Sequence, residues 1–297
     1  MTYRHLFHGE DRVFAAPNWD MVYRAILERI MKSGDTFVGR NGETKSLFGT
    51  STTVDLSVGF PLTRLRKMPV KNLFREFLFD IGFEQNVNAL GPAKHFWDFL
   101  ADENGDLGAT AYNRQWRMWP PSARGSEVAN EELHNVEVDQ LQKTIYKLRR
   151  SSNSRHGTVI THNPTAVNPA CPPCHIGLQF MPRPNGSLDL MVPARSNDMI
   201  VGFPLDIARY AILTHVMAKA VDMKPGRVYM PSANSHVYAN CYEIAETLMT
   251  RTPKNECLLS LSSEWDARAE KPLELLKLEH FSLIGYEAHE AMQVEVN

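Results

Sequence analysis

The chain has 297 residues, of which 43% are hydrophobic and 22% charged, so it is long and apolar enough for one large domain or two modest ones and is not mainly disordered. Its 32 lysines and arginines oppose 34 aspartates and glutamates, and the resulting net charge of -2 supplies no general positive field for binding a nucleic acid. Four cysteines are too few for a disulfide scaffold of this size, which favours a reducing cytoplasm.

Neither the N-terminal segment nor the most apolar stretch is typical of an export or membrane signal. The segment MTYRHLFHGEDRVF carries charges where a signal peptide needs an apolar run. The longest apolar region, 199–221, is interrupted by charged residues, which excludes a membrane-spanning helix. Because no repeat or linker divides the chain, we expect a single cytoplasmic domain over residues 1–297.

Two amphipathic helices are predicted in the first third of the chain. Apolar residues recur at helical spacing over 20–31, with Asn18 or Asp20 available to cap the start and Gly34 to end the helix. A second apolar stripe, over 70–81, leaves Glu76 beside the apolar face of its helix.

The middle of the chain begins with a third helix and then changes period. The helix is predicted over 138–148, and the polar segment 149–156 that follows it forms a loop rich in cations. Apolar residues then alternate over 176–180 and 188–192, on either side of the turn signal Asn185-Gly186. This pattern predicts an antiparallel hairpin.

A long helix is predicted after this hairpin. It begins near Pro204, continues to Ala220 and is closed by Pro225 and Gly226, and a short strand over 228–230 follows. Helices and strands that mix without strict alternation indicate an α+β fold.

The segment Cys171-Pro-Pro-Cys174-His175 is compatible with four chemistries: a zinc half-site, a redox pair, a haem attachment site or one activated nucleophile. A zinc site needs a second close pair, yet Cys241 and Cys257 stand alone, and haem attachment needs export. A redox pair normally opens a helix, whereas this one introduces a strand. The remaining alternative is that the two cysteines are half-buried and have no chemical role. The neighbouring residues are needed to choose among these interpretations.

Short motifs of polar, aromatic and glycine residues surround Cys174 along almost the whole chain. They are Arg40 with Leu47-Phe48-Gly49, Gly59-Phe60-Pro61-Leu62, Trp97-Asp98, Ala101-Asp102-Glu103-Asn104-Gly105-Asp106-Leu107-Gly108, Tyr112, Gln115-Trp116-Arg117, Pro173-Cys174-His175, Gln179-Phe180, Arg195-Ser196-Asn197-Asp198, Gly202-Phe203-Pro204, Ile207-Ala208-Arg209-Tyr210, Ser235-His236-Val237-Tyr238-Ala239-Asn240, and Gly285-Tyr286 with His289. In this order they resemble the thymidylate synthases. The resemblance implies the fold of that family, a mixed sheet covered by helices in one domain.

The resemblance also implies roles for individual residues. Cys174 matches the nucleophile, and Arg195 matches a phosphate-bound neighbour that would lower the pKa of the thiol. The catalytic set is Cys174, Glu76, Asp206 and Tyr112, with Glu76 as general acid and base. The nucleotide set is Arg40, Arg155, His156, Gln179, Arg195, Ser196, Asp198, Asp206, His236 and Tyr238. The set for 5,10-methylenetetrahydrofolate is Glu76, Trp97, Asp198, Gly202 and Phe203.

Part of the nucleotide site is expected to come from a partner subunit. In the resembling family two arginines of the partner complete the phosphate clamp, which implies a homodimer with shared active sites. Arg155 matches the first of these arginines, whereas His156 stands where the second is expected. The clamp is therefore expected to be weaker or sensitive to pH.

One departure from the family pattern concerns recognition of the base. The resembling enzymes read uracil with an asparagine, and this chain has Asp206 at that position. An asparagine amide donates to O4 of uracil and accepts from N3, whereas an ionised carboxylate accepts from the 4-amino group of cytosine and shares a proton with N3. The alternative is that Asp206 only caps its helix. The place of Asp206 at the base-reading position of the motif favours cytosine recognition.

Asp206 makes the chain similar to the deoxycytidylate hydroxymethylases, relatives of the thymidylate synthases. The implied reaction begins with addition of Cys174 to C6, which makes C5 nucleophilic toward the folate-borne carbon. Water then gives 5-hydroxymethyl-dCMP, whereas a hydride from the folate gives 5-methyl-dCMP. The family-like tail and His175 favour the methyl product, and Asp206 favours the hydroxymethyl product, which we expect here. A nucleotide-binding protein without activity, a thiol oxidoreductase and an enzyme acting on dUMP are the weaker alternatives.

Overall fold

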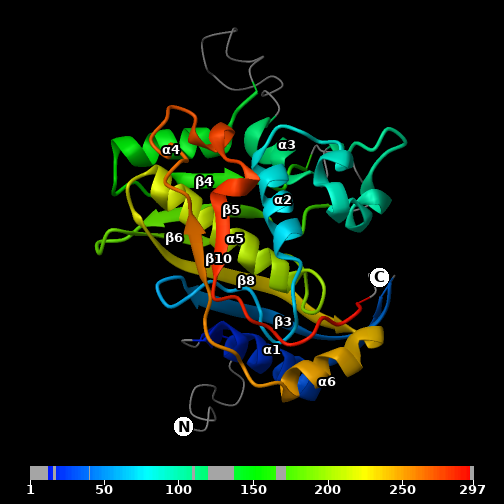
Figure 1. Cartoon of the computed structure of the whole chain (residues 1–297). Helices are drawn as coiled ribbons and strands as arrows, with labels where there is room; N and C mark the ends of the chain where they lie inside the picture. Colours follow the sequence, from blue (N-terminus) through cyan, green and yellow to red (C-terminus); the bar gives the residue numbers. More distant parts are fainter. Residues whose placement is uncertain are drawn as a thin grey trace.

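The computed structural model describes residues 13–15, 18–39, 41–108, 111–119, 137–164 and 172–294 (Figure 1). Its α-helices are α1 (Trp19–Ser33), α2 (Val70–Ile81), α3 (Tyr112–Arg117), α4 (Gln140–Arg150), α5 (Phe203–Ala220) and α6 (Tyr242–Thr250). Its strands are β1 (Val13–Ala15), β2 (Asp35–Gly39), β3 (Gly42–Asp55), β4 (Gly157–Ile160), β5 (Gly177–Pro182), β6 (Ser187–Met191), β7 (Asn197–Asp198), β8 (Lys224–Tyr238), β9 (Leu258–Leu261) and β10 (Phe281–Ile284). Short 3-10 helices, η2 (Val87–Phe96) and η3 (Asp98–Leu100), follow α2.

The central layer is a mixed sheet in the order β1-β3-β8-β6-β5-β4, with β2 paired to β3 and β7 paired to β8. β3 and β8 run antiparallel along most of their length, whereas β6 and β7 run parallel to β8. A separate two-stranded sheet pairs β9 with β10. The predicted α+β class and the mixed sheet covered by helices are confirmed.

The predicted helices are found close to their expected bounds, and side-chain caps begin α1 and α4. The side chain of Asn18 accepts a hydrogen bond from the Met21 amide at the start of α1, and Gly34 ends the helix. α2 has the predicted bounds. α4 begins two residues later than predicted because Asp139 caps it by accepting from the Gln142 amide.

One prediction about the segment after α5 was wrong, and the predicted strand is confirmed but longer than expected. The helix ends at Ala220, and Pro225 and Gly226 do not close it but belong to β8. The expected short strand over 228–230 is the middle of this long strand. A Cβ at Gly226 would collide with Asp189 of β6, so glycine permits the close approach in which the Asp189 carboxylate accepts from the Arg227 amide.

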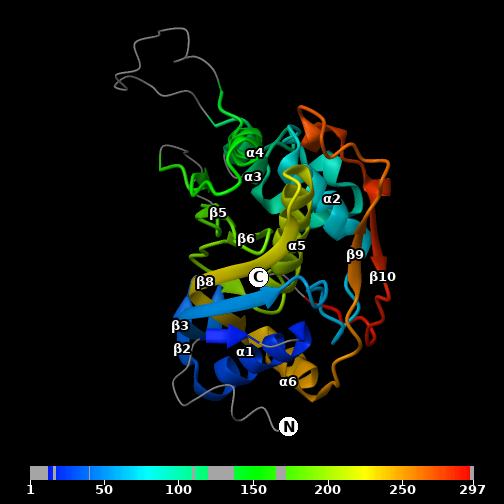
Figure 2. The same ribbon diagram turned by 90° about the vertical axis from the view of Figure 1, so that its left-hand side faces the viewer.

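In the part of the chain that the structure describes, the helices cover one face of the sheet and leave the other open (Figure 2). α5 packs on β6 and β8, and α1 packs on β3 and β8, so inward residues such as Leu190 and Val228 are fully buried. Side chains on the opposite face form a row across five strands, Thr158, Gln179, Met191, Tyr229 and Thr53. Met191 and Ile160 are each 44% exposed on this open face.

No helix in the described ranges is both long enough and apolar enough to span a lipid bilayer.

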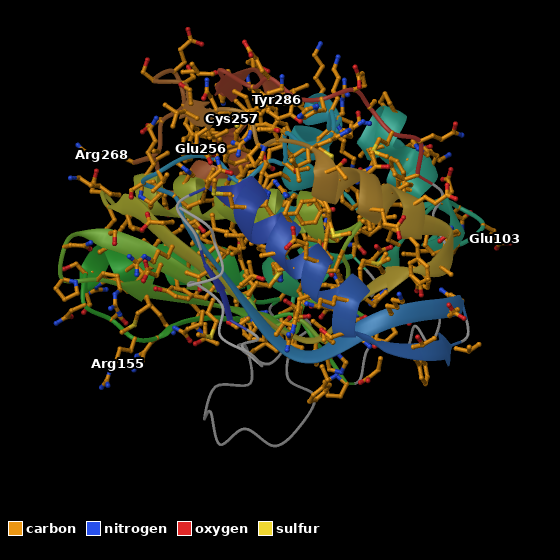
Figure 3. All side chains as sticks on the ribbon, turned by 90° about the horizontal axis from the view of Figure 1, so that it is seen from below. Glu103, Arg155, Glu256, Cys257, Arg268 and Tyr286 are labelled. Carbon is orange, nitrogen blue, oxygen red and sulfur yellow. The ribbon has the colours of Figure 1, made fainter. Side chains whose placement is uncertain are left out.

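A buried ion-pair cluster joins the ends of the chain to its core. Arg64 is fully buried, with its Nε 3.0 Å from Asp20 Oδ2 on α1 and its Nη1 2.5 Å from Glu256 Oε2 in the segment before β9. Tyr286 packs nearby and donates to the Thr63 carbonyl (Figure 3). One guanidinium therefore holds together segments that are far apart in sequence.

We expect Arg64→Ala to lower the free energy of unfolding by about 3–5 kcal/mol, because it leaves the buried Asp20 and the partly exposed Glu256 without their cation. Urea unfolding followed by circular dichroism measures this change. The matched control is Arg268→Ala, which removes an exposed pair with Asp222 and should cost no more than about 1 kcal/mol. Equal effects of the two substitutions would contradict a structural role for the buried cluster.

Candidate active site

A cavity of about 420 Å³ opens where α2, α5, the end of β8 and the turn before β5 meet. Most of the residues proposed from the sequence for catalysis and binding line it. These are Glu76, Trp97, Tyr112, Cys174, Arg195, Ser196, Asp198, Gly202, Asp206, His236 and Tyr238. Segments from the first, middle and last thirds of the chain thus converge on one cavity.

Cys174 and Arg195 are neighbours across two paired segments. The Arg195 amide donates to the Cys174 carbonyl at 2.8 Å, and His175 and Ala194 form the next bridge. The Arg195 guanidinium donates to the carbonyls of Pro173 and Pro172 at 3.1 and 2.6 Å. This arginine therefore holds the turn that presents the thiol to the cavity.

Facing the thiol segment, α2 and α5 contribute a cluster of buried charges centred on Arg209. Its Nη2 lies 2.5 Å from Asp206 Oδ1, its Nη1 lies 2.9 Å from Asp80 Oδ2, and the same Nη1 lies 3.9 Å from Glu76 Oε2. One cation thus contacts three carboxylates from two helices. Gly202 occupies the N-cap position of α5, and Asp206 lies in the first turn of that helix, where a carboxylate also interacts favourably with the helix dipole.

His175 lies behind Asp206 in an aromatic enclosure. Its Nε2 is 3.5 Å from Asp206 Oδ2, and its ring stacks on Tyr112 and meets Tyr210 edge to face at centroid distances of 5.5 and 4.9 Å. The ring is 1% exposed, so its position is determined by packing. Asp206 therefore lies between a guanidinium and an imidazole.

The carboxyl groups of this cluster have different pKa values. Burial raises the Asp206 pKa, but the electrostatic and hydrogen-bond interactions with His175 and Arg209 outweigh this effect and bring it to about 2. Burial raises the Glu76 pKa, and Arg209 offsets only part of the rise. Burial also raises the pKa of Asp80, to about 7, against the opposing charge of Arg209. At neutral pH Asp206 is ionised, whereas Glu76 is better suited to accept and release a proton.

The end of β8 supplies the polar wall opposite these helices. The parallel pairing of β7 with β8 places Asp198 beside His236, whose ring meets Tyr238 edge to face at 4.9 Å. His236 Nδ1 is 3.0 Å from Asn234 Oδ1, and burial lowers the His236 pKa, which favours the neutral imidazole. Asp198 Oδ1 accepts from the amides of Ile200 and Val201, and this shapes the turn into α5.

An apolar wall completes the cavity on the side of η2 and η3. It consists of Phe96, Trp97, Phe99, Leu100, Val201 and Leu205. Phe99 is 67% exposed at this wall, which is unusual for such a large apolar side chain. A flat, partly aromatic ligand fits this surface.

Some residues proposed from the sequence do not line the cavity. Arg155 and His156 are exposed beyond the far end of β4, and Arg155 lies across the molecule from Glu103 in Figure 3. Since Gly157 pairs with Phe180, six residues beyond Cys174, the separation along β5 is roughly 20 Å. The Gln179 amide donates to the Arg155 carbonyl at this far end, while Phe203 packs against Trp19 in the core. Arg40 and Cys171 lie outside the described residues.

Sequence reasoning missed Arg209 and Asp80 as members of the site. Their spacing contains a signal, because Asp80 follows Glu76 by four residues and Arg209 follows Asp206 by three, so each pair shares a helix face. Only the packing of α2 against α5 shows that these two faces meet.

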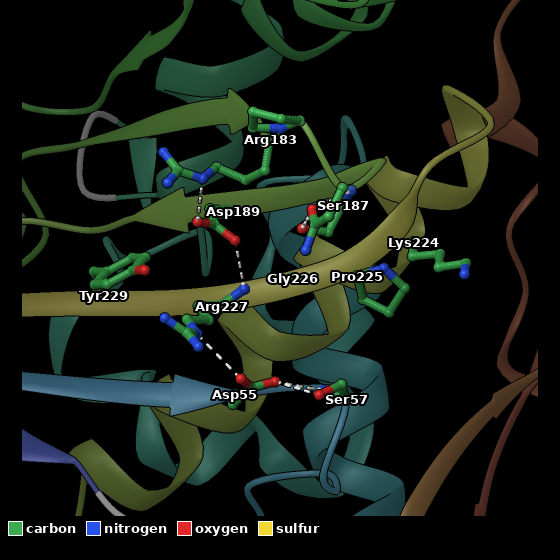
Figure 4. A pocket seen from close by; sticks show the side chains of 12 residues that line it. Asp55, Ser57, Arg183, Ser187, Asp189, Lys224, Pro225, Gly226, Arg227 and Tyr229 are labelled. Atoms are coloured by element: carbon green, nitrogen blue, oxygen red, sulfur yellow. Dashed lines mark hydrogen bonds and ion pairs between the residues drawn. The ribbon is translucent and has the colours of Figure 1, made fainter.

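A second cavity, of about 680 Å³, lies at the opposite end of β8 (Figure 4). It is lined by the β5–β6 turn, the start of β8 and the end of β3. Arg227 binds Asp55 and Arg183 binds Asp189 within it, so its arginines already have carboxylate partners. None of the described site residues proposed from the sequence lines this cavity, whereas most of them line the smaller one.

A comparison with protein families agrees with this geometry. The family model for thymidylate synthase matches residues 21–297, which include every element that lines the smaller cavity. The chain belongs to the thymidylate synthase family. Members of this family transfer a one-carbon unit from methylenetetrahydrofolate to C5 of a pyrimidine nucleotide, and the chain is assigned to this class of transferase.

We expect Cys174→Ala to abolish turnover of pyrimidine nucleotides while changing their binding by less than about tenfold, because the substitution removes the nucleophile and keeps the polar walls. Steady-state rates and calorimetric titration with dCMP and dUMP measure the two effects. Cys257→Ser, at a buried thiol outside the cavity, is the control and should retain turnover. Turnover retained by the Cys174 variant would exclude covalent catalysis by this residue.

Proposed function

We propose that the protein is a folate-dependent transferase that hydroxymethylates C5 of dCMP through a covalent adduct between Cys174 and C6. The observation that carries the proposal is the position of Asp206, a carboxylate on the cavity wall held between Arg209 and His175. Cytidine monophosphate, the ribonucleotide counterpart, presents the same base to Asp206.

An ionised Asp206 discriminates between the two pyrimidines by hydrogen-bond polarity. One oxygen accepts from the 4-amino group of cytosine, and the other shares with N3 a proton that the basic N3 takes up from solvent as the nucleotide binds. Uracil would place O4 against a carboxylate oxygen, and two acceptors would then be buried without a donor. A tight site that rejects such a mismatch discriminates on the order of 10⁴-fold.

The other residues of the cavity have complementary tasks in this proposal. The Cys174 thiolate attacks C6, and Arg195 orients its turn and binds the nucleotide phosphate together with Ser196 and Arg40. Glu76, with its raised pKa, accepts and returns protons near the base. Burial raises the pKa of Tyr112, so its phenol keeps a proton and donates a hydrogen bond near C5.

The sugar and the folate are assigned to opposite walls. His236 and Tyr238 bind the sugar hydroxyls, with Asp198 beside them. Trp97 and Gly202 belong to the side of the cavity that fits a flat folate ring, with Phe203 supporting the start of α5. When bound, methylenetetrahydrofolate supplies the one-carbon unit, and it would also supply a hydride if the product were 5-methyl-dCMP.

One observation favours this methylating alternative. The C-terminal segment is anchored to the segment before α2, since Tyr286 accepts from the Met68 amide and donates to the Thr63 carbonyl, both at 3.0 Å. A tail held in this way helps to exclude water, which disfavours hydroxymethylation. In our assignment the evidence from Asp206 outweighs that from the anchored tail. The folate product distinguishes the two reactions, because only methylation yields dihydrofolate.

The proposal includes a homodimer in which residues 1–297 form one cytoplasmic domain. The open face of the sheet, with Met191 and Ile160 exposed, is suited to packing against a second copy. Arg155 cannot reach the cavity of its own chain from the far end of β5. A two-fold arrangement of the sheets would bring Arg155 and His156 of the partner subunit to the phosphate.

We expect Asp206→Asn to shift the ratio of kcat/KM values from dCMP toward dUMP by at least about 100-fold, because an amide can donate to O4. The change is nearly isosteric, and asparagine caps helices about as well as aspartate, so a purely local structural role predicts no change in base preference. Parallel assays of the parent and the variant with both nucleotides measure the ratio. A parent that prefers dUMP would overturn the assignment to cytosine.

We expect mixtures of the Arg155→Ala and Cys174→Ala variants to recover activity that neither has alone, because one mixed site in each heterodimer would carry both native residues. Random exchange should restore up to about a quarter of the activity of the parent. Subunit exchange is verified with differently tagged chains. Exchange without recovery would exclude shared sites.

A further inference from the structure

Asp80 is a buried carboxyl group that belongs to the charged cluster but is not among the residues that line the active-site cavity. It follows Glu76 by one turn of α2, so the two carboxyl groups share a helix face. Its Oδ2 accepts from Nη1 of Arg209 on α5 at 2.9 Å. No step of the proposed chemistry uses Asp80, although burying a carboxyl group costs free energy.

The guanidinium of Arg209 is shared unequally among the carboxyl groups of the two helices. Nη2 lies 2.5 Å from Asp206 Oδ1. Nη1 lies 2.9 Å from Asp80 Oδ2 but 3.9 Å from Glu76 Oε2. The longer distance exceeds that of a hydrogen bond, so Glu76 lies near the positive charge without accepting from it. Asp80 therefore holds the nitrogen that Glu76 would otherwise bind.

This anchor does not depend on the charge of Asp80. An ionised carboxylate, a neutral carboxyl group and an amide each have an oxygen that accepts from Nη1. Without such an oxygen Nη1 would be buried and unpaired, as Nε of Arg209 already is among the residues that the structure describes. A shift of roughly 1 Å would bring Nη1 into hydrogen-bond range of Glu76. Because unpaired donors on a buried cation are costly, we expect the guanidinium to make this shift when the anchor is removed.

Other titratable and charged groups face Glu76 and Asp80 from the elements packed on α2. They are Asp206 and Arg209 on α5, Tyr112 on α3 and His95 on η2, whereas His280 of η8 (Leu278–His280) is turned to the Lys277 amide, from which its Nδ1 accepts. Within the described ranges Arg209 is the only one of these groups that forms an ion pair with Glu76. The position of its guanidinium therefore governs how strongly a positive charge acts on Glu76.

We infer that Asp80 is a positioning residue, which keeps the guanidinium of Arg209 out of contact with Glu76 so that Glu76 remains able to accept and release a proton. This inference rests on the proposed role of Glu76 as general acid and base, and it does not depend on which pyrimidine the enzyme prefers. Asp80 acts only through Arg209, and the same anchor leaves Nη2 on Asp206.

The test compares three side chains of the same shape at position 80. Asp80→Asn keeps an oxygen that accepts from Nη1, whereas Asp80→Leu replaces both oxygens with methyl groups. Values of kcat and KM are measured between pH 5 and pH 9 with methylenetetrahydrofolate and whichever of dCMP and dUMP the parent converts faster. The pKa of Glu76 is followed without turnover by infrared titration of its carboxyl C=O band, which is assigned by its loss in Glu76→Gln.

In Asp80→Leu we expect the Glu76 pKa, and the limb of the kcat profile that it controls, to move at least about one unit to lower pH, because a contact ion pair favours the carboxylate. The plateau of kcat should fall about threefold or more, since a weaker base transfers a proton more slowly. KM for the nucleotide should stay within about threefold, because Asp206 keeps its contact with Nη2. Asp80→Asn removes the same charge but keeps the anchor, so we expect its shift to be no more than about half as large.

Equal shifts in the two variants would overturn the inference, because the effect would then belong to the charge of Asp80 and not to its hydrogen bond. A raised KM with the Glu76 pKa unchanged would indicate a purely structural role and would also overturn it. Full turnover by Glu76→Gln would instead remove Glu76 from the proposed function, while the infrared shift would still test the position of the guanidinium. If the leucine variant does not fold, Asp80→Val is smaller and equally without an acceptor. The same shift is expected from it, and an unshifted pKa there contradicts the inference.

Discussion

The pairing of β8 with β3 is the interaction on which the rest of the structure depends. These two strands are joined along eleven register pairs, from Asp55 and Arg227 at one end to Thr44 and Tyr238 at the other. β6 and β7 add to β8 in parallel, and α5 packs on its inner face. The candidate active site lies at one end of β8 and the larger charged cavity at the other. A single long strand therefore places the sugar-binding residues opposite the helices that read the base.

Buried charge is the second constraint on this fold. Removing carboxylates from water costs several kcal/mol each unless a cation and hydrogen bonds compensate. Around Arg209 the compensation is incomplete, since three carboxylates share one guanidinium and a neighbouring imidazole. Because the negative charge is not fully compensated, the carboxyl groups differ in pKa. Asp206 stays ionised, whereas Glu76 and Asp80 hold protons more readily. The excess of carboxylates over cations therefore gives the site both a hydrogen-bond acceptor, Asp206, and a group that can transfer a proton, Glu76.

The sequence predicted those parts of the fold that short-range patterns determine. α1 and α2 follow from apolar spacing and, for α1, from Asn18 and Gly34, and the β5–β6 hairpin follows from alternation around Asn185-Gly186. β3 was not predicted, because GETKSLFGTSTTVD is polar and depends on its two neighbouring strands for stability. The site residues were predicted from the order of family motifs, since periodicity alone gives no reason to bring Glu76 to Cys174. Contact between Asp80 and Arg209 depends on the packing of two helices that are distant in sequence.

The most direct measurement of the central claim is the conversion of dCMP, CMP and dUMP by the unmodified protein, each with methylenetetrahydrofolate. Mass spectrometry identifies the nucleotide product, and absorbance distinguishes tetrahydrofolate from dihydrofolate. The account predicts that dCMP is converted most efficiently, gains one CH2O unit and leaves tetrahydrofolate. Efficient conversion of dUMP with little conversion of dCMP would contradict the reading of Asp206 as an ionised acceptor for cytosine.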